Sequence, residues 1–319
     1  MERAGDIAAA AGSLRPSDPL LRRGLHVGIG LIIVLGVVLA LTASLGRLPE
    51  IEWSFRPGWL ALGTLAFAVT LAINAEIWRR ILLALGPRID PLPAQAIWLT
   101  SGLGRYVPTS LLMPMVRVAM CEREGVAKRI CLASVVYEMA LALMGAIVLG
   151  AYFVIDLPAL QGHWERFLVL AVPIAGVIAL HPRVFHYAAD VLLTRLGRAT
   201  LPASLSLPQI AAFTALYVLS FVVAGIGVYG FAHTSYPVDS GDLVVITGAF
   251  AVATALGLIA FVLPAGIIAR EAGLAVALAP VMPAGPALAV AVIARIVQIA
   301  LELGMALAGQ AALRLRRAD

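Results

Sequence analysis

The chain has 319 residues, of which 61% are hydrophobic and only 13% are charged, and its mean hydropathy is +0.98. These proportions leave too little polar surface to coat a water-soluble globule of this size, so they exclude a soluble enzyme and favour a membrane protein. The net charge of +5 does not indicate nucleic-acid binding, because the Lys and Arg residues stand in short clusters between apolar runs, without a basic domain.

Apolar segments of about 20 residues recur along the chain, which is the length that an α-helix needs to cross a hydrocarbon core roughly 30 Å thick. The pattern predicts an all-α polytopic membrane protein. A disordered cytoplasmic tail is expected over residues 1–24, ahead of an uncleaved first span, and a second tail over residues 314–319. Six full spans are predicted, at about residues 26–45, 58–78, 130–155, 167–180, 209–231 and 286–313.

Two further segments are apolar but interrupted. The first, residues 93–121, is broken around Pro108, and the second, residues 243–282, is broken at Pro264 and Gly266. Backbone that is not helical is tolerated at membrane depth only where protein or a water-filled cavity surrounds it, so both breaks are expected to face inward, toward a site. Each segment is predicted to form a re-entrant hairpin of two short helices.

Basic residues cluster in alternate loops, which predicts the orientation of the chain by the positive-inside rule. One basic cluster lies before the first span and another at the end of the chain. Three more follow the second span, the first hairpin and the fourth span. The loop 233–242 has no Lys or Arg, so it is expected outside. Both termini are then expected in the cytoplasm.

These orientations agree only if each broken segment returns to the side from which it entered. The order span, span, hairpin, span then occurs twice with opposite topology, which predicts an inverted repeat. Its halves are about residues 25–155 and 167–313 of a single transmembrane domain over residues 25–313. An alternative stays open, because the arms of the second hairpin are long enough to cross the bilayer, which gives eight spans with the same termini inside.

Two motifs occur in the interrupted segments. The first is GRYVP over residues 104–108, followed by Arg117 and Glu138, and the second is FVLPAGIIAREA over residues 261–272. In this order they resemble the transmembrane region family of lysylphosphatidylglycerol synthases and their stand-alone relatives, over about residues 25–313. The resemblance implies a protein that moves lipids, or lipid-linked head groups, between leaflets. In the synthases this region accompanies a soluble aminoacyl transferase domain, and because only six residues follow Leu313 we expect no synthase activity here.

Charged residues within the apolar segments are the candidates for a lipid-binding site, because a charge at the bilayer centre costs about 2.5 to 3.5 kcal/mol and needs a partner, water or an interface. Glu138 lies deep in its span. We expect it to pair with Arg105, Arg117 or a substrate cation, or to titrate; the alternative is an ion pair that only locks helices. Arg117 can equally reach toward the cytoplasmic head groups.

Arg270 and Glu271 are expected to open a short helix directly after the second break. The free N–H groups of a helix start and a guanidinium can both bind phosphate, so these residues are a candidate contact for a lipid phosphate. The alternative is a first-turn acid beside an arginine at the interface. Arg105, next to Tyr106 and Pro108, combines a broken backbone with a fixed cation in the same way.

Arg295, Gln298 and Glu302 share one face of the last span by their spacing, and this face is expected to point into the bundle. It either lines a lipid path or holds helices together. Glu76 is expected to form a surface pair with the arginines three and four residues on. The predicted substrate-binding or translocation residues are therefore Arg105, Tyr106, Pro108, Arg117, Glu138, Pro264, Gly266, Arg270, Glu271, Arg295 and Glu302.

The resemblance, together with these charged residues, implies a lipid translocase of a bacterial inner membrane whose partner is a membrane lipid: an anionic or aminoacylated phospholipid, or a polyprenyl-phosphate-linked glycan. We expect no cofactor and no metal, because the histidines lack ligand spacing and no phosphate-binding loop or hydrolase elbow occurs. One alternative is a membrane-embedded transferase that acts on a lipid-linked sugar. Another is a non-transporting subunit that anchors a soluble or membrane transferase partner.

Overall fold

The computed structural model describes residues 56–106, 112–156, 162–184, 204–234, 236–260 and 266–316, together with Tyr187 and Val191. Every regular element within these residues is helical, in agreement with the predicted fold class. The predicted span 26–45 and the chain ends lie outside them. The helices in chain order are α3 (Pro57–Ala84), α4 (Pro91–Gly102), η1 (Leu103–Tyr106), α5 (Leu112–Arg123), α6 (Lys128–Asp156), η3 (Trp164–Leu170), α7 (Ala171–Leu180), α9 (Leu207–Ala232), α10 (Asp242–Ala260), α11 (Gly266–Ala277) and α12 (Ala284–Arg316).

Five of the described helices, α3, α6, α9, α10 and α12, are long and apolar enough to cross a membrane. The chain is thus a polytopic helical membrane protein. Four of these helices coincide with predicted spans, and α3 continues to Ala84, beyond the predicted end at residue 78. Its last turns are supported by Glu76, which pairs with Arg79 at 2.7 Å and with Arg80 at 2.9 Å, so the expected surface pair is confirmed.

The predicted span 167–180 is not one continuous α-helix. A 3₁₀ helix, η3, precedes α7, which has ten residues. Pro173 gives the physical reason, because inside a continuous helix it would remove the hydrogen bond to residue 169 and clash with that carbonyl. In the structure it falls in the first turn of α7, where its missing N–H is not needed.

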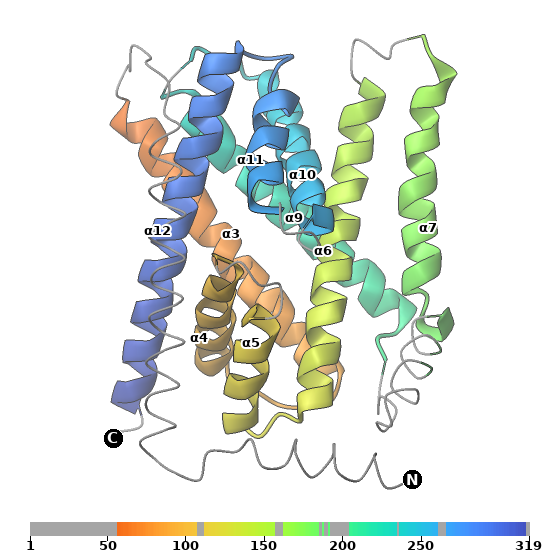
Figure 1. The fold of residues 1–319 in the computed structure, drawn as a ribbon, viewed down its shortest axis with the longest axis vertical. Helices are drawn as coiled ribbons and strands as arrows, with labels where there is room; N and C mark the ends of the chain where they lie inside the picture. The colour runs from red at the N-terminus through yellow and green to blue at the C-terminus, as the bar shows by residue number, and fades with distance from the viewer. Residues whose placement is uncertain are drawn as a thin grey trace, which may run out of the picture.

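The two interrupted segments form helix pairs that approach the middle of the molecule from opposite ends (Figure 1). The pair α4 and α5 lies in the lower half of the view, and the pair α10 and α11 lies in the upper half. The breaks themselves, residues 107–111 with Pro108 and residues 261–265 with Pro264, lie outside the described residues. The helices α6 and α12 stand upright on either side of these pairs.

Helices α3 and α9 run diagonally and antiparallel through the bundle and pack closely against each other (Figure 1). Glycines permit this approach. A Cβ atom on Gly230 would lie 2.9 Å from the carbonyl oxygen of Trp59 and 3.0 Å from the nitrogen of Gly63. The rings of Phe67 and Phe231 then pack edge to face with their centroids 5.2 Å apart. The α3–α9 contact therefore combines a close approach of the two backbones with ring packing beside it.

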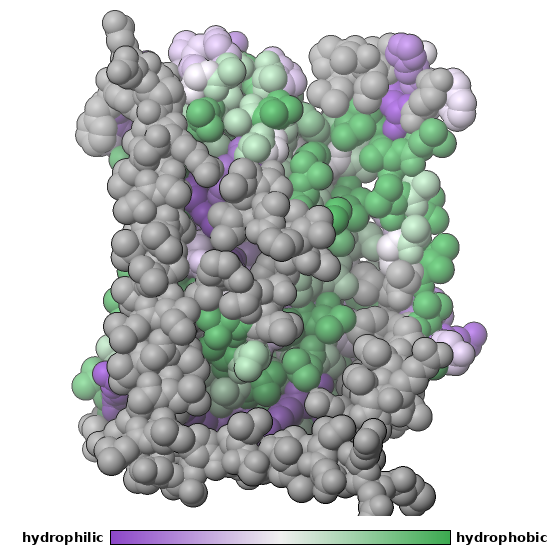
Figure 2. Space-filling model, in the orientation of Figure 1, coloured by the Kyte–Doolittle hydropathy of each residue, from purple (hydrophilic) through white to green (hydrophobic). Residues whose placement is uncertain are grey.

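The surface has the polarity of a membrane protein. Figure 2 shows apolar groups around the middle of the molecule and polar groups near its ends, together with a polar patch visible deep in the upper half. Large apolar side chains point outward at mid-helix positions, such as Leu65 of α3, Ile174 of α7 and Leu307 of α12, which are 60% or more exposed. Lipid is the solvent that such a surface fits.

We predict that Gly230→Ala destabilises the protein by about 1 to 3 kcal/mol, because the added methyl group meets only backbone atoms, which must separate α3 from α9. Thermal unfolding in detergent measures the effect. Gly304→Ala on α12 is the matched control, since nothing lies within 4 Å of its Cβ position. Helix propensity predicts a gain of up to about 1 kcal/mol there. Equal melting temperatures for the two variants would contradict the close approach.

Candidate functional site

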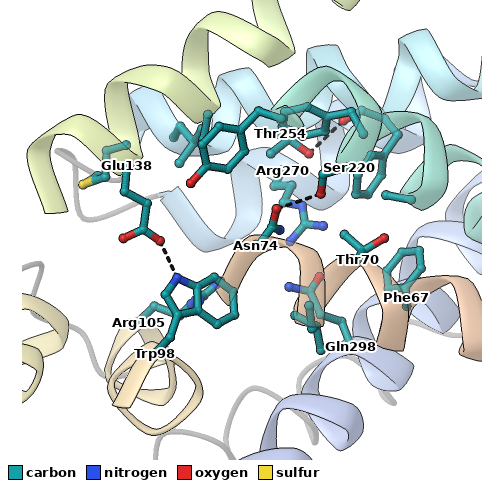
Figure 3. Close-up of a pocket in the computed structure, with 18 of the residues that line it drawn as sticks. Phe67, Thr70, Asn74, Trp98, Arg105, Glu138, Ser220, Thr254, Arg270 and Gln298 are labelled. Carbon is teal, nitrogen blue, oxygen red and sulfur yellow. Dashed lines mark hydrogen bonds between the residues drawn. The ribbon is translucent and has the colours of Figure 1, made fainter. Parts of the chain in front are cut away.

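A cavity of about 200 Å³ lies inside the bundle, where the two helix pairs meet α3, α6, α9 and α12 (Figure 3). Part of its wall is apolar, including Phe67, Leu71, Phe221, Phe250 and Leu258. The rest is polar, with Thr70, Asn74, Arg105, Arg117, Glu138, Tyr217, Ser220, Thr254, Arg270 and Gln298. Because membrane-crossing helices surround it, the cavity offers a polar environment at membrane depth.

Arg117 of α5 and Glu138 of α6 form an ion pair in the cavity wall, as expected for Glu138. The Arg117 side chain is 1% exposed, so the alternative in which it reaches the head groups is wrong. Its Nε donates to Ser101 Oγ at 2.9 Å, and its guanidinium lies 5.0 Å from the ring centroid of Trp78. Glu138 Oε1 accepts a second hydrogen bond, from Trp98 Nε1 at 2.6 Å. Both charges are therefore compensated within the protein.

Glu302 of α12 gathers three donors on another side of the site. Its carboxylate accepts hydrogen bonds from the Tyr106 hydroxyl at 2.9 Å and from Gln298 Nε2 at 2.7 Å. Arg105 Nη1 lies 3.5 Å from Glu302 Oε1. Since Tyr106 and Arg105 belong to η1, this carboxylate ties α12 to the first helix pair.

Arg295 of α12 makes the matching contact with the second helix pair. Its Nε lies 3.2 Å from Glu271 Oε1 of α11, and both side chains are about nine-tenths buried. Its guanidinium also lies 4.9 Å from the ring centroid of Tyr106. The predicted inward face of the last span is confirmed, because Arg295, Gln298 and Glu302 are all buried. Two turns of α12 thus contact both helix pairs through ion pairs. The residue on α12 is the anion Glu302 toward the first pair and the cation Arg295 toward the second.

Arg270 differs from the other arginines of the site. Within the described parts of the chain no carboxylate lies at ion-pair distance from it, and its guanidinium lies 5.3 Å from the ring centroid of Phe250. The prediction that Arg270 and Glu271 open the helix is wrong, because α11 begins one turn earlier, at Gly266. Glu271 is accordingly not a first-turn acid but the partner of Arg295. In Figure 3 the Arg270 side chain extends into the site beside Asn74.

The structure thus brings most of the predicted residues together. Arg105, Arg117, Glu138 and Arg270 line the cavity, whereas Tyr106, Glu271, Arg295 and Glu302 form the charged contacts next to it. Gly266 begins α11, and Pro108 and Pro264 lie outside the described residues.

Sequence reasoning missed the uncharged polar residues of the site other than Gln298. Ser220 Oγ donates to Asn74 Oδ1 at 2.7 Å and thereby joins α9 to α3. The Tyr217 hydroxyl is buried and has no hydrogen-bond partner within the described structure. Trp98 holds Glu138. The only signal was a scatter of single Ser, Thr, Asn and Tyr residues in apolar runs, which does not distinguish a cavity wall from ordinary helix packing.

We predict that Glu138→Gln lowers the free energy of unfolding by about 3 kcal/mol, because it leaves the buried Arg117 without its counter-charge. Adding Arg117→Gln should recover a large part of the loss, since the unpaired charge is removed. Glu76→Gln is the control, because its pairs with Arg79 and Arg80 are partly open to solvent and a surface pair contributes about 1 kcal/mol or less. Thermal unfolding in one detergent measures all of these variants. A double variant less stable than Glu138→Gln would argue against the pair as the origin of the loss.

Comparison with known proteins places the chain in a family. The family model described as the lysylphosphatidylglycerol synthase TM region matches residues 27–304. A comparison with curated protein sequences found no match. The matched range contains both interrupted segments and every charged residue of the site. The chain therefore belongs to the lysylphosphatidylglycerol synthase transmembrane-region family.

Proposed function

We propose that this protein is a lipid translocase. It moves the polar head group of a phospholipid, or of a polyprenyl-phosphate-linked glycan, between the leaflets of a bacterial inner membrane. The observation that carries the proposal is the polar cavity at membrane depth, toward which helix pairs converge from opposite ends of the molecule. Membership of a family named for the synthesis of a phospholipid supports it.

The cavity has the mixed lining that such a cargo needs. A head group that leaves water must exchange its hydration for hydrogen bonds, and the arginines, Asn74 and the hydroxyl groups of the lining can supply them. The aromatic and aliphatic part of the wall contacts apolar parts of the lipid, whose tails stay in the bilayer. This activity makes and breaks no covalent bond, so we propose a transporter rather than an enzyme.

In this proposal the two halves are inverted repeats and both helix pairs are re-entrant. The directions of the helices in Figure 1 support it, because α3 runs downward and α9 upward, whereas α6 runs upward and α12 downward. One half consists of α3, the α4–α5 pair and α6, and the other of α9, the α10–α11 pair and α12. Movement of one pair away from α12 opens the cavity toward one leaflet, and movement of the other pair opens it toward the opposite leaflet.

The proposed movement of lipid involves no chemical reaction, so its free energy must come from another source. A lipid gradient, a coupled ion or the membrane potential can supply it, and the potential contributes about 2.3 kcal/mol per charge per 100 mV. The lower end of the molecule in Figure 1 is assigned to the cytoplasm, because the described Lys and Arg residues of the helix ends concentrate there, with Arg123, Lys128 and Arg316 among them.

We predict that Ala142→Phe abolishes lipid movement while the protein remains folded, because Ala142 lines the cavity and a phenyl ring fills much of its volume. The measurement is transbilayer movement of a tail-labelled lipid in proteoliposomes, with the melting temperature recorded on the same preparation. The control is Ala61→Phe, which adds the same ring to an exposed position on α3. Normal transport by Ala142→Phe would show that the cavity is not part of the lipid pathway.

The orientation has its own test, in a background where the buried Cys121 and Cys131 are replaced by alanine. Glu122→Cys lies at the end of α5 and Asp239→Cys lies in the loop before α10, and both positions are exposed. We predict that an impermeant thiol reagent labels Asp239→Cys in intact cells, and Glu122→Cys only after permeabilisation. Labelling of both from the same side would rule out helix pairs that enter from opposite faces.

A further inference from the structure

Charge is distributed unevenly over the cavity lining. Three arginines, Arg105, Arg117 and Arg270, face one carboxylate, Glu138, so the described lining carries a net charge of +2. Arg117 and Glu138 compensate each other. Arg105 and Arg270 remain, and they come from different helix pairs, since Arg105 belongs to η1 and Arg270 to α11.

Neither of these two cations is fully compensated. Arg105 shares Glu302 with two other donors, Tyr106 and Gln298, and lies 3.5 Å from it. Arg270 has no ion pair in the described structure. A cation within the bilayer is unfavourable without a counter-charge, so the two arginines favour an anion between them.

The uncharged polar groups of the lining also favour a negatively charged ligand. Asn74 uses its carbonyl oxygen to accept from Ser220, which leaves its amide N–H groups for a ligand. The Tyr217 hydroxyl, in a residue that is 3% exposed, has no partner within the described residues and can donate. A cationic head group would instead need a counter-charge, and the one carboxylate of the described lining already accepts from Trp98 and Arg117. Among the lining residues, the neutral Gln298 Oε1 is a buried acceptor without a partner in the described structure, and it carries no charge that would compensate a cation.

From this excess of donors and cations we infer that the cavity selects a phosphate-bearing head group of net negative charge and excludes aminoacylated, net cationic lipids. The inference rests on the proposed function and names the charge class of its cargo. Arg105 and Arg270 hold the phosphate from the two helix pairs, so that bound anion joins the two halves of the protein. Guanidinium groups suit this role because they bind phosphate oxygens in a bidentate manner.

Binding to the purified full chain tests the inference. Native mass spectrometry compares phosphatidylglycerol with its lysyl ester, which has the same tails and phosphate but a net positive charge. We expect phosphatidylglycerol to bind at least about tenfold more tightly, and Arg270→Gln to lose at least about tenfold of that affinity, as the loss of a charge-assisted hydrogen bond predicts. Equal or tighter binding of the lysyl ester would overturn the inference.

Controls separate charge selection from folding and from binding of a soluble anion. Arg80→Gln removes an exposed arginine outside the cavity and should leave binding unchanged, and melting temperatures are recorded for every variant. Arg270→Lys keeps the positive charge but loses the paired N–H donors of the guanidinium group. We therefore expect its affinity to lie between those of Arg270→Gln and the unchanged protein. If inorganic phosphate bound while neither lipid did, the site would take a soluble anion and the inference would fail.

Movement of the same two lipids in proteoliposomes then distinguishes the inference from the proposed function. Selective binding of phosphatidylglycerol without any movement would contradict the proposed translocase function but support selection by charge. Movement of both lipids at equal rates would overturn the charge selection and leave the translocase standing. The expected result is movement of phosphatidylglycerol alone, lost in Arg270→Gln.

Discussion

A charge that cannot leave the interior of a bilayer must be compensated there, and the arrangement of this bundle depends on that constraint. Arg117 and Glu138 satisfy it between α5 and α6, and Arg295 and Glu271 satisfy it between α12 and α11. Glu302 is compensated by donors from η1 and from its own helix. Removing one partner would strand the other at membrane depth, so these pairs fix which helices are neighbours. The helix pairs are thus joined to their neighbours by charged contacts as well as by packing.

Aromatic rings provide the second part of this compensation. The guanidinium groups of the four arginines at the site each lie within about 6 Å of a ring centroid: Arg105 beside Trp98, Arg117 beside Trp78, Arg270 beside Phe250 and Arg295 beside Tyr106. Such contacts are electrostatically favourable and become stronger when water is excluded. A ring, unlike a carboxylate, leaves the net positive charge of the cation in place. The site can therefore hold arginines at depth and keep their field available to a ligand.

The sequence predicts the presence of the long helices better than it predicts the contacts between them. The apolar length of α6, α9 and α12 alone defines them as spans, because the bilayer imposes one length on every crossing helix. The inward face with Arg295 and Glu302 follows from helical spacing. The partner of Glu138 could not be chosen between Arg105 and Arg117, because that choice depends on how α5 lies against α6. The sequence motif around Pro264 indicates a break without fixing where the helix resumes, so it predicts a start of α11 that is one turn too late.

The seven-residue spacing of Arg295 and Glu302 has a consequence for membrane integrity. Separation of α11 from α12 strands a cation on α12, whereas separation of η1 strands an anion, so each opening costs one ion pair. In the proposed movement, opening at both ends together would cost both pairs at once, which disfavours a continuous aqueous route relative to opening at one end. Two turns of a single helix would then also act as a barrier against the leakage of protons and ions.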